Sequence, residues 1–201
     1  MKRLFLTLVV ALSSASTLSA QTTAREWLDG LSATLGERYA LHINVSMPES
    51  ETLNGYFMVE DDSFYITLGA MEVFSNGKLR YEVNNDRKEV TEDRVDLTSR
   101  DLLSNPTRAF NFVDEEFEVS IAESIERGAV LVLKPRSGDA AISTVYMAVI
   151  ADGSRVLPVM IIYDYEGDMV NIRLSMADVG TSALPRWDKS AYRAYDIVSF
   201  L

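Results

Sequence analysis

A two-residue periodicity runs through most of this sequence and restricts its fold more than any other feature. Between positions 39 and 47, apolar side chains at odd positions alternate with smaller or more polar ones, which is typical of a half-buried strand. Similar strands are expected at 53–60, 63–68, 71–75, 78–84, 89–91, 117–125, 129–133, 144–150, 158–163 and 169–179. Short strands separated by turn residues predict an antiparallel, mainly β sandwich or barrel.

A single helix is predicted ahead of these strands. Thr23 and Glu26 form a capping box, and Trp27 and Leu31 belong to an apolar helical face that follows it. Gly36 can end the helix because glycine adopts a positive φ without steric cost. The periodicity changes from helical to two-residue directly after this glycine.

A second non-strand segment spans residues 98–113. Leu102 and Leu103 are expected on a short helix that Asn105-Pro106 breaks, and Phe110 on a second helical turn. A helical insertion between strands must lie over the sheet, since its apolar side needs cover.

The first twenty residues have the pattern of a secretory signal peptide. Lys2 and Arg3 precede the apolar run 4–12, small residues follow, and Ala20 suits the position before the cleavage site. We therefore expect an exported protein with a signal peptide at 1–20 and one domain at 21–201.

Composition excludes several classes of function. The chain has no cysteine, one histidine and a formal net charge of −11. Disulfides, thiolate metal sites and cysteine nucleophiles are therefore impossible, and no metal site or cofactor is expected. An acidic chain also disfavours nucleic acid as its partner. His42 is interpreted as a surface or hydrogen-bonding residue and not as a catalytic one.

Two glycine turns predict which strand residues share a face. A tight turn at Asn76-Gly77 pairs Phe74 with Leu79 and places both beside Tyr81. A turn at Asp152-Gly153 groups Met160 and Ile162 with three other apolar residues, Met147, Val149 and Val156. The opposite face of that second hairpin is also apolar. The hairpin therefore needs cover on both sides, or one of its sides lines an apolar cavity. The pattern alone does not decide between an ordinary core and a cavity.

Several stretches, taken in order, resemble the LolA-like outer-membrane lipoprotein carriers. These stretches are 55–57, 64–66, 74–81, 131–135, 151–153 and 192–198. The resemblance implies an unclosed antiparallel β-barrel, or curved half-barrel, that is covered by the N-terminal helix and the helical insertion. It also implies a monomeric periplasmic carrier, not an enzyme, that holds lipoprotein acyl chains and takes them toward the outer membrane.

By this resemblance, the partners are acylated lipoproteins, an inner-membrane lipoprotein-release complex and an outer-membrane acceptor. The expected cavity residues are Leu41, Ile43, Phe57, Phe64, Ile66, Phe74, Leu79, Tyr81, Met160, Ile162, Ile172 and Leu174. The expected lid residues are Trp27, Leu31, Leu102, Leu103 and Phe110.

The sequence differs from the family's pattern at one stretch, and two functions other than a lipoprotein carrier are also considered. Proteobacterial relatives carry a basic residue after the second strand that bonds the lid shut, whereas this chain has Glu60-Asp61-Asp62-Ser63. The alternative function is a periplasmic β-domain that binds glycolipid or another lipid without transferring lipoproteins. A hydrolase is the third hypothesis, for which the sequence offers no pairing of nucleophile and base.

Overall fold

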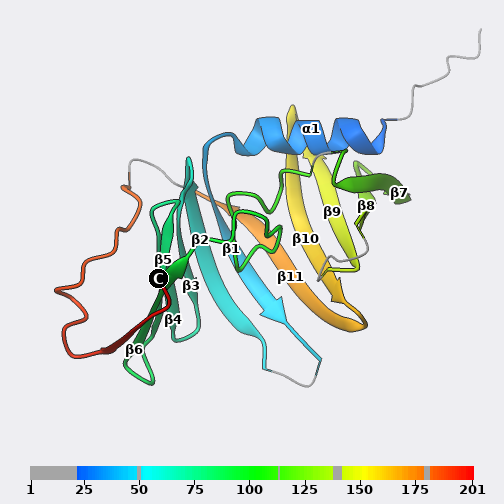
Figure 1. Ribbon diagram of the computed structural model, residues 1–201. Helices are drawn as coiled ribbons and strands as arrows, with labels where there is room; N and C mark the ends of the chain where they lie inside the picture. The colour runs from blue at the N-terminus through cyan, green and yellow to red at the C-terminus, as the bar shows by residue number, and fades with distance from the viewer. Residues whose placement is uncertain (1–21, 49–50, 113, 138–141, 179–181) are drawn as a thin grey trace, which may run out of the picture.

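The computed structural model describes residues 22–48, 51–112, 114–137, 142–178 and 182–201. The predicted signal peptide at 1–20 lies outside these residues. Within them, the chain forms one helix and twelve strands (Figure 1). No helix in the described ranges has both the length and the apolar character needed to cross a membrane.

The strands form one curved sheet that does not close. Their bounds are β1 Arg38–Ser46, β2 Leu53–Glu60, β3 Ser63–Leu68, β4 Met71–Ser75, β5 Leu79–Asn84, β6 Glu89–Arg94, β7 Phe117–Ile125, β8 Gly128–Pro135, β9 Thr144–Asp152, β10 Arg155–Tyr165, β11 Asp168–Ala177 and β12 Asp196–Ser199. The order across the sheet is β12-β6-β5-β4-β3-β2-β1-β11-β10-β9-β8-β7. The predicted mainly β, unclosed architecture is therefore confirmed.

The helix α1, Ala24–Leu35, begins and ends as the sequence predicts. The Thr23 hydroxyl accepts from the Glu26 backbone, the Glu26 side chain bonds back to Thr23, and Gly36 ends the helix at a φ of 62°. The helix packs against β10, where the Val156 amide donates to the Thr34 hydroxyl at 2.9 Å. Gly30 permits this approach, since an added Cβ would lie 2.7 Å from a Val156 methyl group.

The insertion between β6 and β7 is present, but the prediction that it is helical is wrong. Its described part, residues 98–112, is a series of turns. The Asp101 carboxylate accepts from the Leu103 and Ser104 amides and starts one turn, and the break at Asn105-Pro106 separates it from the next. Pieces this short do not gain enough hydrogen bonds to propagate a helix. Val113 lies outside the described residues.

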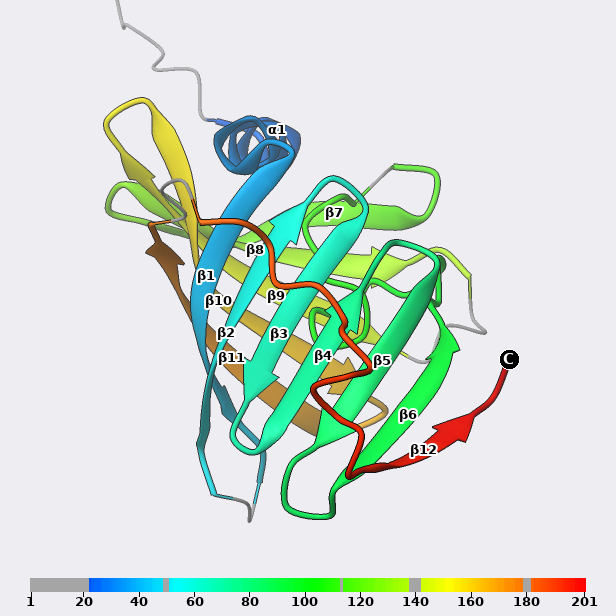
Figure 2. The ribbon, with the colours of Figure 1, turned by 90° about the vertical axis from the view of Figure 1, so that its left-hand side faces the viewer.

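The two faces of the sheet have different covers. The concave face carries the main apolar cluster, and α1 and the insertion pack against it (Figure 1). The convex face of β2 to β5 is crossed by residues 182–195, here called the C-terminal strap (Figure 2). The side chain of Leu184 packs there on Ala40 and Met58, at one end of the strap.

The β4–β5 hairpin differs from its predicted register by two residues. Phe74 pairs with Tyr81, and Ser75 with Arg80, so the loop has four residues and not two. The Asn76 side chain accepts from the amides of residues 78 and 79 and so shapes the longer loop. Only Gly77 takes a positive φ in this loop, at 84°, so the predicted I′ turn is also wrong.

A bulge in β10 changes the faces predicted for the β9–β10 hairpin. Pro158 pairs with Val149 but Met160 pairs with Ala148, so Val159 has no partner of its own. One extra residue reverses the alternation of all that follow. Met160 and Ile162 therefore lie on the convex face, opposite to the prediction, whereas Ile161 and Tyr163 join the concave cluster.

The last strand, β12, was not predicted. It pairs in parallel with β6, through Ile197 opposite Val90, at one edge of the sheet. All four of its residues are exposed and apolar residues do not alternate along it, so it lacks the two-residue signal.

Candidate functional site

The concave face is the candidate binding surface, and seven of the predicted cavity residues lie on it. They come from β1, β2, β3 and β11, and all are buried within the main cluster. These seven residues are Leu41, Ile43, Phe57, Phe64, Ile66, Ile172 and Leu174. Because they come from adjacent strands, they form one continuous apolar surface under the insertion.

Five predicted cavity residues lie on the convex face instead. Phe74 faces Tyr81 across the β4–β5 ladder, and Leu79 shares their side of β5. Phe64 and Ile66 pair with Ser75 and Val73, so they point the other way. Met160 and Ile162 are displaced to the convex side by the bulge described above. The prediction that these five line the same cavity is therefore wrong.

Phe74 and Tyr81 on the convex face are covered by an aromatic stack from the C-terminal strap. The Trp187 ring lies between Tyr81, at 4.6 Å, and Tyr192, at 4.9 Å, with nearly parallel planes, and Phe74 packs beside them. Glu72 accepts from the Tyr65 hydroxyl at 2.8 Å. These contacts explain why β4 and β5 are apolar on the side away from the main cluster.

The insertion fills the concave face. Leu102 is fully buried and Phe110 is 4% exposed. Trp27 and Leu31 from α1, together with Leu103, pack on the same cluster. All five predicted lid residues thus contact the concave apolar surface, and the surface is covered by side chains of the chain itself.

Tyrosine hydroxyls on the sheet form hydrogen bonds with the backbone of the insertion. The Tyr39 hydroxyl donates to the Pro106 carbonyl at 2.9 Å. The Tyr163 hydroxyl accepts from the Leu102 amide at 3.0 Å and donates to the Arg100 carbonyl at 3.1 Å. Burial raises the pKa of Tyr163 well above its usual value, so the phenol stays protonated and can donate.

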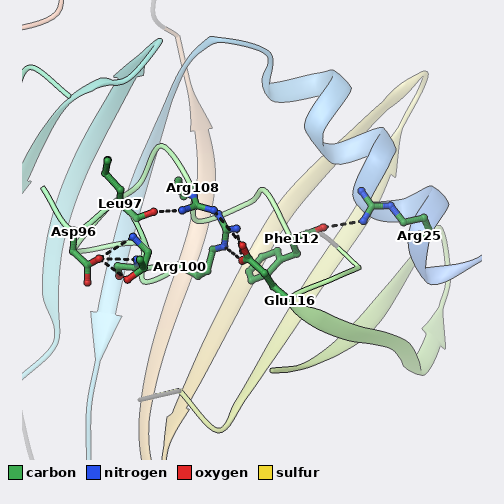
Figure 3. Close-up of polar contacts among 9 residues, drawn as sticks. Arg25, Asp96, Leu97, Arg100, Arg108, Phe112 and Glu116 are labelled. Carbon is green, nitrogen blue, oxygen red and sulfur yellow. Dashed lines mark hydrogen bonds and ion pairs between the residues drawn. The ribbon is translucent and has the colours of Figure 1, made fainter. Parts of the chain in front are cut away.

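Three arginines hold the ends of the insertion (Figure 3). Arg25 of α1 donates to the Phe112 carbonyl at 2.8 Å. The Arg100 guanidinium donates through Nε to Glu116 at 3.0 Å and also through Nη2. Arg108 lies 3.5 Å from the other oxygen of Glu116 and donates to the Leu97 carbonyl. Glu116 therefore joins two arginines of the insertion to the segment before β7.

A pocket of about 580 Å³ opens beside the insertion. Its wall includes Arg100 and Asp101 from the insertion, Phe117 from β7 and Tyr165 from β10. The Tyr165 hydroxyl donates to Asp101, and burial together with this bond raises the pKa of Tyr165. The pocket thus combines polar groups with aromatic surface at the edge of the concave face.

A smaller pocket of about 280 Å³ lies near the end of α1, between Gly36, Asp61 and Thr107. Asp61 and Asp62, from the stretch Glu60-Asp61-Asp62-Ser63, both line it. The hydrogen bonds and ion pairs of the insertion described above involve other residues, not Asp61 or Asp62.

The remaining candidate chemistry is sparse. The His42 ring lies on the convex side of β1 against Tyr56, with ring centroids 5.6 Å apart. Among the described residues, no group of three or more histidine, aspartate or glutamate side chains is placed to hold a metal ion. The concave face itself is made of apolar side chains, and the tyrosine hydroxyls there bind the backbone of the insertion.

Sequence reasoning missed Tyr163, Arg100 and Glu116. The bulge at Val159 hides the inward direction of Tyr163, since the regular alternation places it outside. Arg100 is 4% exposed, although arginine in a loop ordinarily indicates a surface residue. Its only sequence signal is the neighbouring apolar pair Leu102-Leu103.

Comparison with known proteins gives a likeness of fold without a likeness of sequence. No protein-family model matches the chain, and no curated protein sequence matches it significantly. An uncharacterized conserved protein from Thermus thermophilus is similar in structure, with a TM-score of 0.55 and 11% identity. That match covers 88% of this chain and 98% of the Thermus chain, and it shows that the fold occurs in a solved structure.

More distant solved structures are also similar. LprF from Mycobacterium bovis has a TM-score of 0.43 and 14% identity, over 80% of this chain and 96% of its own. A LolA superfamily protein from Nitrosomonas europaea has a TM-score of 0.37 and 12% identity, over 86% of this chain and 98% of its own. The structural neighbours of this chain therefore include a LolA superfamily protein, at low sequence identity.

Proposed function

We propose that this protein is a periplasmic carrier that binds the acyl chains of lipoproteins on its concave face and carries them toward the outer membrane. The observation that carries the proposal is a continuous apolar surface, shaped by an open sheet, whose cover is a set of turns. An acyl chain that replaces this cover moves from water into contact with apolar side chains. This transfer stabilises the complex by about 0.8 kcal/mol for each buried CH₂.

The cover has properties that suit displacement. Its contacts to the sheet are apolar side chains such as Phe110 and isolated hydrogen bonds such as Tyr39 to Pro106, without a strand ladder. An intramolecular cover of this kind offsets part of the gain from acyl binding, so a bound lipid can be released again. The expected cavity residues in this proposal are the seven that lie on the concave face.

The expected partners follow from the family resemblance. They are an acylated lipoprotein as cargo, an inner-membrane release complex as donor and an outer-membrane acceptor, with the carrier acting as a monomer. The second candidate is a periplasmic domain that binds glycolipid or another lipid without a transfer role, and the same apolar surface favours it.

Site-specific cross-linking tests the proposal. A photo-reactive phenylalanine replaces Leu174 on the concave face of β11, or Met160 on the convex face of the adjacent β10, in the full chain produced in a diderm bacterium. We expect cross-links to acylated polypeptide at position 174 and none at position 160. Cross-links to a glycolipid at 174 would support the second candidate, and equal labelling at both positions would refute the use of the concave face.

A further inference from the structure

The pocket of about 580 Å³ lies at the opposite end of the concave face from the contact between α1 and β10. The helix contacts β10 at Val156, near the start of the strand, whereas the pocket is lined by Tyr165, at its end. Phe117 and Pro135, which pair at the ends of β7 and β8, line the same pocket. The pocket therefore lies at one end of the concave face and is here called the mouth; Ser99, Arg100, Asp101 and Ser104 of the insertion border it.

Arg100 lines this mouth and carries, just behind its wall, a donor without a partner in the described part of the chain. Its Nε and Nη2 atoms donate to Glu116, but Nη1 is buried and has no hydrogen-bond partner among the residues that the structure describes. The residue itself is 4% exposed and lines the pocket. A buried donor that lacks an acceptor is destabilising, and more so on a charged group, so an oxygen supplied by a ligand would stabilise the site.

The charge of the pocket restricts that ligand. Four carboxylates, Asp96, Asp101, Glu115 and Glu116, line it beside one cation, Arg100, and within the described ranges only Glu116 is paired with arginines. The pKa of Asp96 is lowered by hydrogen bonds from Thr98 and Ser99, so this carboxylate is ionised at neutral pH. An anionic ligand oxygen, such as a phosphate or a free fatty carboxylate, would meet this repulsion, whereas a neutral oxygen would not.

We infer that this mouth binds the carbonyl end of a neutral acyl ligand, an ester or an amide, whose oxygen accepts from Arg100 Nη1 after a small shift of the pocket wall uncovers that atom. The inference rests on the proposed function, because the acyl chain attached to that carbonyl would continue along the concave face. Phe117 and Tyr165 provide the apolar wall where chain and carbonyl meet. Ester and amide carbonyls share this chemistry, and an acylated polypeptide can contain both.

Affinities for four probes that share one chain test the inference. The probes are pyrenedodecane, the methyl ester and the N-methyl amide of pyrenedodecanoic acid, and the ionised acid. We expect the full chain to bind the ester, the amide or both about tenfold more tightly than the hydrocarbon, and to bind the acid more weakly than either. A preference for the ester alone identifies a lipid ester, and one for the amide alone identifies an N-acyl group.

Two variants test the assignment to this pocket. Arg100→Met removes the donor, and Ser104→Phe fills the mouth from its wall should the first variant not fold. Both are expected to abolish the preference for a carbonyl, expressed as the ratio of hydrocarbon to ester or amide dissociation constants. Ser175→Phe, at an exposed position on β11, is the matched control and should keep that ratio.

The outcomes separate this inference from the proposed function. Binding of the hydrocarbon without any preference for a carbonyl overturns the inference and leaves the carrier proposal standing. A preference that survives in folded Arg100→Met or in Ser104→Phe also overturns it. Failure of the wild-type protein to bind any of the four probes would overturn both.

Discussion

Truncation of Phe110 should weaken the cover and strengthen acyl binding at the same time. Phe110 is 4% exposed and packs edge-on against Tyr39, with ring centroids 6.2 Å apart. Removal of a buried phenylalanine side chain costs about 3–5 kcal/mol in a well-packed protein. We assume that the insertion must leave the concave face before an acyl chain can bind. The truncation then destabilises only the state in which the insertion covers that face.

The expected change in affinity follows from that cost. A factor of ten in the population of the uncovered state corresponds to about 1.4 kcal/mol, so a loss of about 3 kcal/mol raises that population by roughly a hundredfold. Relaxation of the neighbouring side chains reduces the effect, and we expect Phe110→Ala to bind a fluorescent fatty-acyl probe at least about tenfold more tightly.

The assay needs a reporter that is distant from the cover. In a Trp27→Phe background, Trp187 is the remaining tryptophan and reports on the strap of the convex face. Urea unfolding followed at Trp187 gives stability, and probe titration gives affinity. Met58→Ala is the matched control, since Met58 is buried on the convex face under Leu184 and its truncation should lower stability without raising affinity.

Two results would refute this reasoning. Probe binding that weakens in Phe110→Ala would mean that the insertion is a permanent part of the core. An equal gain of affinity in Met58→Ala would mean that binding follows general loosening of the fold and not release of the cover.

Three further predictions concern stability. Gly77→Val should lower the urea midpoint more than Gly153→Val. Both positions have a positive φ, but an added Cβ at Gly77 also lies 3.0 Å from the Asp62 carbonyl oxygen. Equal losses in the two variants would contradict this. Trp187→Ala should cost about 2–4 kcal/mol in urea unfolding, followed by circular dichroism, and leave acyl-probe affinity unchanged, since its stack lies on the convex face. Burial, and then Glu72, raises the pKa of Tyr192 from 10.0 to about 12, so its contribution to stability is complete below pH 10 and lost as the pH rises to about 12. Tyr192→Phe should reduce this alkaline loss in pH-dependent unfolding, and an unchanged profile would contradict the assignment.

Local signals in the sequence were sufficient for most elements. The capping box at Thr23 and Glu26 defines the start of α1 because both partners lie within one turn. Alternation located eleven of the twelve described strands, with several bounds displaced by one to three residues. These features depend on neighbours in the chain, which the sequence displays directly.

The assignment of faces depends on features that the sequence does not display. Nothing in the sequence around Val159 is typical of a bulge, yet the bulge there reverses the direction of the Ile162 side chain. The apolar side of Phe74 and Tyr81 matches a cavity wall as well as it matches a surface under another segment. The segment that covers it, around Trp187 and Tyr192, has no strand or helix periodicity, so its docking could not be predicted from its own residues.

Bonds from several elements hold the cover in place. A single charged lock would concentrate its binding energy in one contact, whereas here Arg25, Tyr39 and Tyr163 each bind a backbone carbonyl of the insertion. Each such bond contributes about 0.5–1.5 kcal/mol, somewhat more for the charged donor. Because these three acceptors are backbone groups, substitutions in the insertion outside Arg100 and Arg108, whose side chains bind Glu116, change its apolar contacts with the sheet while the three bonds keep their acceptors. The fit of the insertion to the concave face can therefore vary independently of the bonds that hold it, which separates the affinity for an apolar ligand from the position of the cover.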